Sequence, residues 1–247
     1  MRDPLGFRHR FGVLGPSTNT IVQPDMEAMR PPGVTNHYSR IFTPDAHAVS
    51  NETFMLGARL IGDNTLDAVG SVMTAGPDSL VMGMSAVTFF GGIAGAGAFQ
   101  ARIEAASGLA VCIGSHAVAA ALRAVGARRV AFMSPYFPSA NAEVRQYLHE
   151  AGFSVVRDSC LQCPGWTAIA ATPEAVVRDS LRALDGDDVD AIVQVGTNLS
   201  AVRIAAAAEL WLGKPVLAIN AATYWHALRS NGIQDRVDGC GRLLRDF

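Results

Sequence analysis

The stretch Asp190-Ala-Ile-Val-Gln-Val-Gly-Thr-Asn-Leu-Ser200 decides the fold. Its apolar run, Ala191 to Val195, is typical of a strand buried on both faces. The run ends at Gly196, and small polar residues that can cap a helix starting near Ala201 come next: Thr197, Asn198 and Ser200. In an open α/β sheet, ligands bind where the carboxyl end of a strand leads into a helix, because backbone N–H groups are free there. The stretch therefore predicts a binding site at the edge of a sheet.

The same order of residue types occurs in a second stretch, Ser79-Leu-Val-Met-Gly-Met-Ser-Ala-Val-Thr-Phe89. The alternation of strands and helices then restarts at Arg129, and Pro135 to Asn141 parallels Gly15 to Thr20. Strict alternation predicts parallel sheets with right-handed crossovers. We therefore predict two pseudo-symmetric α/β halves of the flavodoxin or Rossmann type. Each is a parallel sheet with helices on both faces, and the active-site cleft lies between the halves. Residues 1–115 plus 217–247 would form the first half and residues 116–216 the second.

The hydrophobic pattern places each element approximately. The predicted strands are 11–14, 34–42, 81–85, 109–113, 129–134, 153–156, 191–195 and 215–219. The predicted helices begin near residue 20 and continue with 51–74, 91–106, 117–125, 142–151, 173–184, 201–212 and 222–229.

Composition and charge exclude several function classes. The chain has 247 residues, 49% of them hydrophobic, and a formal net charge of −2 with no basic run. We expect a globular protein that is attracted neither to nucleic acid nor to an anionic membrane. The N-terminal stretch lacks the apolar core of a signal peptide, and no apolar run is long enough to span a bilayer. We therefore expect a cytoplasmic protein, and the sequence leaves a homo-oligomer open.

The cysteine and glycine patterns favour neither a metal nor an organic cofactor. Four cysteines in a chain of this length do not make a disulfide scaffold, and the pair Cys160 and Cys163 lacks the second pair of a zinc site. The stretch Gly91 to Gly97 reads G-x-x-G-x-G instead of the dinucleotide fingerprint G-x-G-x-x-G, and no Walker lysine follows. We therefore predict a site without metal or cofactor.

Uncharged hydrogen-bonding residues follow several predicted strands: Ser17, Thr18, Asn19, Ser85, Tyr136, Thr197 and Asn198. Such groups, together with helix N-termini, suit a small carboxylate or an oxyanion. Each residue alone could equally be an ordinary cap. Their presence at equivalent strand ends of both halves favours a shared site for a small carboxylate.

Five motifs resemble one superfamily in the same order along the chain: Gly15-Pro-Ser-Thr-Asn-Thr20, Met84-Ser-Ala-Val-Thr-Phe89, Ser134-Pro-Tyr136, Gly196-Thr-Asn-Leu199 and Tyr224-Trp-His-Ala-Leu-Arg229. They resemble the aspartate/glutamate racemase superfamily, in its branch of maleate cis–trans isomerases and arylmalonate decarboxylases. The resemblance implies two pseudo-symmetric α/β halves and chemistry on small carboxylates without metal or organic cofactor. In that family one or two cysteines move a proton or attack carbon.

This chain departs from the family at both cysteine positions. It reads Met84-Ser85-Ala86 where the family usually has Cys-Thr-Ser, and Gly196-Thr197-Asn198 where it has Cys-Thr-Asn. A thioether cannot transfer a catalytic proton, and glycine has no side chain. The resemblance thus predicts that Met84 and Gly196 line a substrate site whose acid or base is not a cysteine.

Three residues are candidates for that acid or base. His47, in a loop that in the family folds over the substrate, and His116, near the start of a helix, can titrate near neutral pH. An exposed loop residue and a packing residue are the respective alternatives. Tyr136 matches a family tyrosine that hydrogen-bonds the substrate carboxylate. Trp166, Phe89 and Phe90 are candidates for an apolar wall, although core packing is the commoner role of aromatic residues.

These residues support three hypotheses about function. The first is a cofactor-independent isomerase or decarboxylase that acts on a malonate- or maleate-like carboxylate through an enediolate. The second is a hydrolase or hydratase in which a histidine activates water or a serine. The third is a carboxylate-binding protein without catalytic activity.

Overall fold

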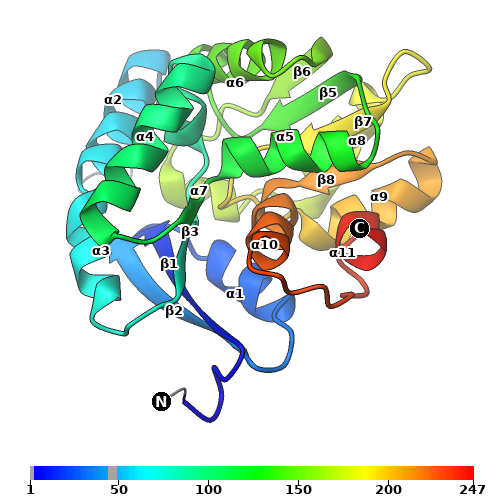
Figure 1. Ribbon diagram of the computed structural model, residues 1–247. Helices are drawn as coiled ribbons and strands as arrows, with labels where there is room; N and C mark the ends of the chain where they lie inside the picture. Colours follow the sequence, from blue (N-terminus) through cyan, green and yellow to red (C-terminus); the bar gives the residue numbers. More distant parts are fainter. Residues whose placement is uncertain (1–2, 44–48) are drawn as a thin grey trace.

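The computed structural model of the chain describes residues 3–43 and 49–247, and its strands form two four-stranded parallel sheets. The strand order is β2-β1-β3-β4 in the first sheet and β6-β5-β7-β8 in the second, so the two sheets repeat one topology (Figure 1). The first sheet contains β1 (His9–Pro16), β2 (Val34–Ile41), β3 (Ser79–Met82) and β4 (Val111–Cys112). The second contains β5 (Arg129–Ser134), β6 (Ser154–Cys160), β7 (Ala191–Gln194) and β8 (Val216–Ala218). The predicted pair of flavodoxin-like α/β halves is thereby confirmed.

Helices cover both faces of the sheets. Those that precede β5 are α1 (Val22–Ala28), α2 (Asn51–Asp63), α3 (Thr65–Met73), the short 3-10 helix η1 (Ala86–Phe89), α4 (Gly92–Ser107) and α5 (Gly114–Ala124). Those that follow are α6 (Pro138–Glu150), α7 (Trp166–Ala170), α8 (Glu174–Leu184), α9 (Val202–Leu212), α10 (Ile219–Ser230) and α11 (Arg242–Asp246). Although it follows the second sheet in the chain, α10 packs against α5, α1 and β3 (Figure 1). Helix α10 thus connects the second half of the chain to elements of the first.

The apolar runs seen in the sequence form the buried centres of the sheets. Every residue of β3 and of β7 is buried, as expected for central strands covered by helices on both faces. β8 pairs with β7 and crosses the predicted boundary at residue 217. The division of the chain into residues 1–115 plus 217–247 and residues 116–216 remains a prediction.

Several local predictions were wrong. The helix expected over residues 51–74 is two helices, because Asn64 ends α2 and its side-chain amide donates to the carbonyl of Phe42. The cap residue of α9 is Ala201, and no side chain caps that helix, so Thr197 and Asn198 have other partners. The short helices α7 and α11 were not predicted, since five residues are too few for a helical hydrophobic period.

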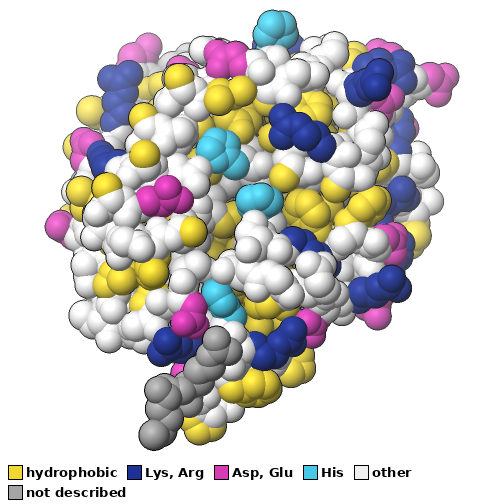
Figure 2. Space-filling view, viewed as in Figure 1, with side chains coloured by type: hydrophobic (Ala, Val, Ile, Leu, Met, Phe, Trp, Pro, Cys, Tyr) yellow, Lys and Arg dark blue, Asp and Glu magenta, His cyan; other side chains and the backbone are white. Residues whose placement is uncertain are grey.

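The surface shows no concentration of one charge on the face in Figure 2, where basic and acidic side chains are interspersed. Among the residues that the structure describes, no helix is long and apolar enough to cross a membrane.

Candidate active site

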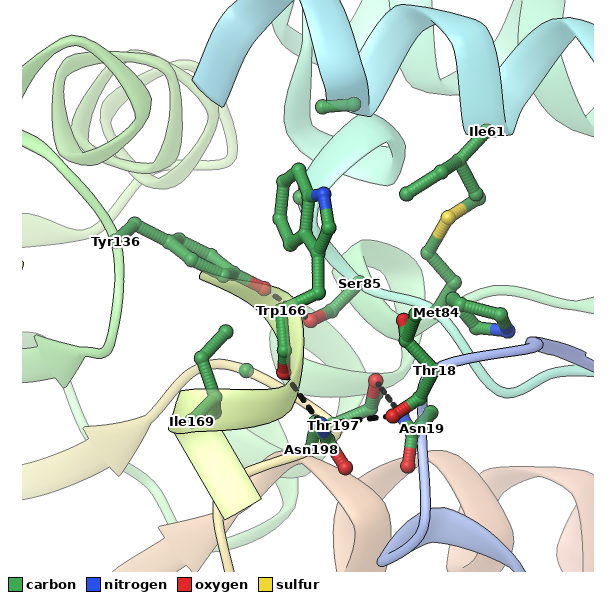
Figure 3. A pocket seen from close by; sticks show the side chains of 14 residues that line it. Thr18, Asn19, Ile61, Met84, Ser85, Tyr136, Trp166, Ile169, Thr197 and Asn198 are labelled. Atoms are coloured by element: carbon green, nitrogen blue, oxygen red, sulfur yellow. Dashed lines mark hydrogen bonds between the residues drawn. The ribbon is translucent and has the colours of Figure 1, made fainter. Parts of the chain in front are cut away.

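A pocket lies at the carboxyl ends of the four central strands, β1, β3, β5 and β7 (Figure 3). The strand order reverses between β1 and β3 in the first sheet and between β5 and β7 in the second. Open α/β sheets bind ligands at such a reversal. The pocket contains about 440 Å³ of empty space, part of it open to solvent. Its lining residues from the strand ends are Pro16, Thr18, Asn19, Met84, Ser85, Ala86, Tyr136, Gly196, Thr197 and Asn198, and α2 and α7 add Ala58, Ile61, Trp166 and Ile169.

Asn19 and Thr197 connect the two halves across the floor of the pocket. The Asn19 side-chain oxygen accepts from the backbone N–H groups of Ile21 and Val22, which fixes the start of α1. Its amide nitrogen donates to Thr197 Oγ1 over 3.0 Å (Figure 3). Both residues are buried. The second amide hydrogen of Asn19 and the hydroxyl hydrogen of Thr197 have no acceptor among the described residues, so both can donate to a ligand.

Ser85 and Tyr136 bring together a second pair of polar groups from the two halves. Their hydroxyl oxygens are 2.7 Å apart, and both side chains are buried (Figure 3). The Tyr136 backbone N–H donates to Ser134 Oγ, and the Tyr136 ring packs against Phe54. Burial raises the pKa of Tyr136 far above its ordinary value, although the hydrogen bond with Ser85 opposes this. Tyr136 therefore keeps its proton at neutral pH and can act as a donor.

Asn198 lines the pocket, but its side chain holds the surrounding loops. Its oxygen accepts from the N–H of Thr20, and its nitrogen donates to the carbonyls of Trp166 and Thr18. Both amide hydrogens are thereby used within the protein. The prediction that Asn198 hydrogen-bonds a ligand through its side chain therefore has no support from this geometry.

The backbone at Gly196 accommodates no side chain. Its φ of +114° lies in a region that L-residues with side chains rarely adopt. A Cβ atom there would be 2.5 Å from Cδ of Pro135, so a cysteine does not fit without a shift of the loop. On the opposite side of the pocket, the buried Met84 side chain provides an apolar thioether. Both positions face the pocket, and neither carries a group that can transfer a proton.

An apolar wall formed by α2 and α7 completes the pocket. The Trp166 ring packs against Phe54 and fits over Gly57, where a Cβ would be 2.9 Å from the ring. The indole N–H is buried and has no partner among the described residues. Ala58, Ile61 and Ile169 were not anticipated, because their sequence pattern does not differ from that of ordinary core residues. Of the three aromatic residues named from the sequence as candidates for an apolar wall, Trp166 lines the pocket, and Phe89 and Phe90 do not.

The remaining predicted site residues lie elsewhere. Ser17 is exposed, and its hydroxyl accepts from the N–H of Thr43, whereas Thr18 lines the pocket. His116 does not line the pocket, because α5 directs its ring towards Tyr147, at 6.2 Å between ring centroids. Burial lowers the pKa of His116. The prediction of His116 as the acid or base therefore has no support, and His47 lies outside the described residues.

The described pocket residues include no charged side chain, no histidine and no cysteine. Cys112 Sγ instead contacts His226 Nδ1 at 3.2 Å and donates to the carbonyl of Thr223. Burial raises the pKa of Cys112 to about 12, so this thiol stays protonated. No cluster of three histidine, cysteine or acidic residues suited to a metal ion occurs among the residues that the structure describes.

Comparison with known proteins gives consistent results. The sequence profile of the arylmalonate decarboxylase family matches residues 42–244. A maleate isomerase of Nocardia farcinica is 29% identical over 98% of this chain and 97% of its own length. An arylmalonate decarboxylase of Bordetella bronchiseptica is 32% identical over 66% of this chain and 69% of its own length.

A solved structure agrees with the fold. The Nocardia farcinica maleate cis–trans isomerase, in a cysteine-to-serine variant with a covalently bound succinylcysteine intermediate, superposes with a TM-score of 0.87 and 26% sequence identity. The superposition covers 97% of this chain and 99% of the isomerase.

Proposed function

Because the chain belongs to the arylmalonate decarboxylase family, we propose that it removes carbon dioxide from a small malonate-type dicarboxylate with an apolar substituent. The relatives are enzymes of the isomerase and lyase classes that act on small carboxylates. The observation that carries the proposal is the division of the pocket into uncharged donors on one side and apolar side chains on the other, with no thiol among its described lining residues. Cleavage of a carbon–carbon bond by loss of carbon dioxide needs no enzyme nucleophile.

The donors at the ends of β1 and β7 would hold the carboxylate that stays. The Thr197 hydroxyl and the free Asn19 amide hydrogen are uncharged and fixed by their neighbours. When carbon dioxide leaves, the electron pair of the broken bond moves into the remaining group and forms an enediolate. Preorganised donors stabilise such a developing oxyanion more strongly than the starting carboxylate.

The apolar wall would receive the substituent and the departing carboxylate. This wall includes Trp166, Ile61 and Met84. Among its described groups, only the buried indole N–H of Trp166 can hydrogen-bond to that carboxylate. A carboxylate is unfavourable in apolar surroundings, and neutral carbon dioxide is not. The pocket would therefore favour loss of the carboxylate that faces this wall.

The Ser85–Tyr136 pair is the proposed proton donor to carbon. One hydroxyl would give its proton to the α-carbon of the enediolate, which yields the monocarboxylate product. Water would then return a proton to the hydroxyl. Its raised pKa makes Tyr136 a weak acid, but an enediolate carbon is a far stronger base than a carboxylate oxygen.

The proposal favours decarboxylation over cis–trans isomerisation. The isomerase relative was solved with a covalently bound succinylcysteine intermediate. All four cysteines of this chain lie outside the residues that line the pocket. A cysteine adduct in this pocket is therefore not part of the proposed reaction.

The test is incubation of the protein in D₂O with phenylmalonate, methylphenylmalonate and maleate, followed by ¹H NMR of the products. We expect the two malonates to give monocarboxylates that carry one solvent deuterium at the α-carbon, while maleate stays unchanged. Conversion of maleate to fumarate without decarboxylation would contradict the proposal. Binding of the malonates without turnover would instead favour a carboxylate-binding protein.

A further inference from the structure

A closed ring, made of hydrogen bonds and the backbone of α1, lies behind the pocket floor. Asn19 fixes the start of α1, and α1 carries Asp25. The Asp25 carboxylate accepts from the Asn220 amide nitrogen over 2.8 Å, and the same nitrogen donates to the backbone carbonyl of Thr197 over 3.0 Å. The Thr197 hydroxyl accepts from Asn19, which closes the ring. Neither Asp25 nor Asn220 lines the pocket.

The orientation of the Asn220 amide is fixed by its partners. Both are acceptors, so the NH₂ group must face them, and each of its hydrogens has one acceptor. A rotated amide would place its oxygen against two other oxygens. Asn220 is 2% exposed, and its own oxygen has no hydrogen-bond partner among the described residues that would favour another orientation. The side chain therefore has one favourable orientation.

Asp25 is the only ionisable side chain in this ring, and its carboxylate is linked to the Thr197 carbonyl through the Asn220 amide. A carboxylate is a stronger acceptor than a neutral oxygen, and charge-assisted hydrogen bonds are roughly twice as strong as neutral ones. Removal of the Asp25 side chain would leave one Asn220 hydrogen without its acceptor and the amide free to rotate.

We propose that Asn220 and Asp25 are positioning residues of the site: Asn220 holds the Thr197 carbonyl, and Asp25 orients the Asn220 amide. Together they keep the Thr197 hydroxyl next to Asn19, where it can donate to a bound carboxylate. This inference rests on the proposed carboxylate site and extends it to two residues that do not line the pocket.

The experiment is calorimetric titration of the protein with 2-phenylpropionate, the monocarboxylate expected from methylphenylmalonate. Asn220→Ala should weaken binding about tenfold or more, the loss expected when one hydrogen-bonded donor is misplaced. Asp25→Ala should weaken it less, and Asp25→Asn should restore most of the affinity because an amide oxygen still accepts from Asn220. Val177→Ala, in the buried face of α8 away from the pocket, is the matched control for lost stability.

The outcomes separate the two proposals. If Asn220→Ala binds the acid as tightly as the unaltered protein, or loses no more affinity than Val177→Ala at equal loss of stability, the positioning role is wrong and the carboxylate site stands. If Asp25→Asn binds as weakly as Asp25→Ala, the role assigned to Asp25 is wrong. If the unaltered protein does not bind the acid, the carboxylate site and the inference both fail.

Discussion

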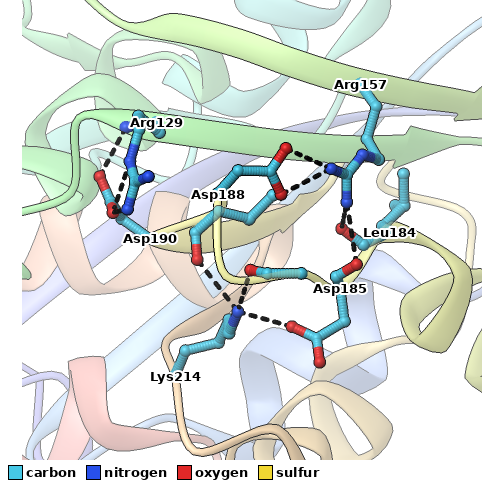
Figure 4. Close-up of polar contacts among 9 residues, drawn as sticks. Arg129, Arg157, Leu184, Asp185, Asp188, Asp190 and Lys214 are labelled. Carbon is cyan, nitrogen blue, oxygen red and sulfur yellow. Dashed lines mark hydrogen bonds and ion pairs between the residues drawn. The ribbon is translucent and has the colours of Figure 1, made fainter.

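The two ends of the sheets carry opposite kinds of chemistry. At the amino ends, arginine–aspartate pairs join the two central strands of each sheet: Arg10 with Asp78 in the first and Arg129 with Asp190 in the second. Each aspartate also accepts from the backbone N–H of its arginine. Figure 4 shows the pair of Arg129 and Asp190. At the carboxyl ends, the same four strands lead to the pocket, where the described lining residues include no charged group.

The difference follows from exposure. The paired groups at the amino ends are partly exposed, so water stabilises their charges while they fix the strands. The carboxyl ends are buried between the two halves, where an unpaired charge would be costly. Uncharged donors keep this site stable when it is empty and leave the negative charge to the ligand.

The largest effect should come from the carboxyl ends. Replacement of Tyr136 by Phe, or of Ser85 by Ala, should lower kcat for methylphenylmalonate about 100-fold or more, as expected when a proton donor is lost. Tyr147→Phe is the control, because Tyr147 is also buried but does not line the pocket. If both tyrosine variants lose activity equally, the Ser85–Tyr136 pair is not the proton donor.

The second prediction concerns a cysteine introduced at position 196, where this chain has a glycine. Gly196→Cys should cost about 1–3 kcal/mol of stability because of its backbone strain, with a further cost from the contact with Pro135. Gly152→Cys also has a positive φ, +92°, but no atom within 4 Å of its Cβ position, so it should lose less. Urea unfolding measures both variants. Equal losses would contradict the role assigned to Pro135, and faster turnover by Gly196→Cys would contradict a pocket that excludes a thiol.

The third prediction concerns Asp25, the carboxylate that accepts from Asn220 behind the pocket floor. Burial raises the pKa of Asp25 from 3.8 to about 6, so folding favours its protonated form. The resulting stabilisation is complete below pH 3.8 and is lost as the pH rises through about 6. The unaltered protein should therefore lose stability relative to Asp25→Asn between pH 4 and pH 7 in urea unfolding. Parallel stability curves for the two proteins would contradict a buried Asp25.

The smallest effect should come from the amino ends. The Arg129 guanidinium and two backbone N–H groups lower the pKa of Asp190 to about 2. Asp190→Asn should cost about 1 kcal/mol or less at pH 7, because half of the Arg129 side chain is exposed, and it should leave activity unchanged. The stabilisation by Asp190 is present above its ordinary pKa of 3.8 and is lost as the pH falls through about 2. A loss of activity without loss of stability would contradict a purely structural role.

The sequence predicted the arrangement of the strands and the residues directly after them. Asn19, Ser85, Tyr136 and Thr197 were found because each follows an apolar run, and parallel strands bring their carboxyl ends together. His116 also follows a strand, but the rotation of α5 takes its ring away from the pocket, and sequence spacing does not determine that rotation.

Other parts of the site depend on tertiary contacts that leave no local pattern. The side-chain amide of Asn198 is a group that could hydrogen-bond a ligand, yet its partners are the backbone groups of Thr20 and Trp166. Asp25 and Asn220 are 195 residues apart and meet only because α10 returns to α1. The obstruction at Gly196 arises from Pro135 on a neighbouring strand end.

The most direct test of a thiol-free site is the turnover of a cysteine-free variant, Cys112→Ala, Cys160→Ala, Cys163→Ala and Cys240→Ala combined, with methylphenylmalonate in D₂O. If uncharged hydroxyl and amide groups perform the reaction, the variant will keep the kcat of the unaltered protein and place one deuterium at the α-carbon. Loss of turnover by a folded variant that still binds 2-phenylpropionate would contradict the account.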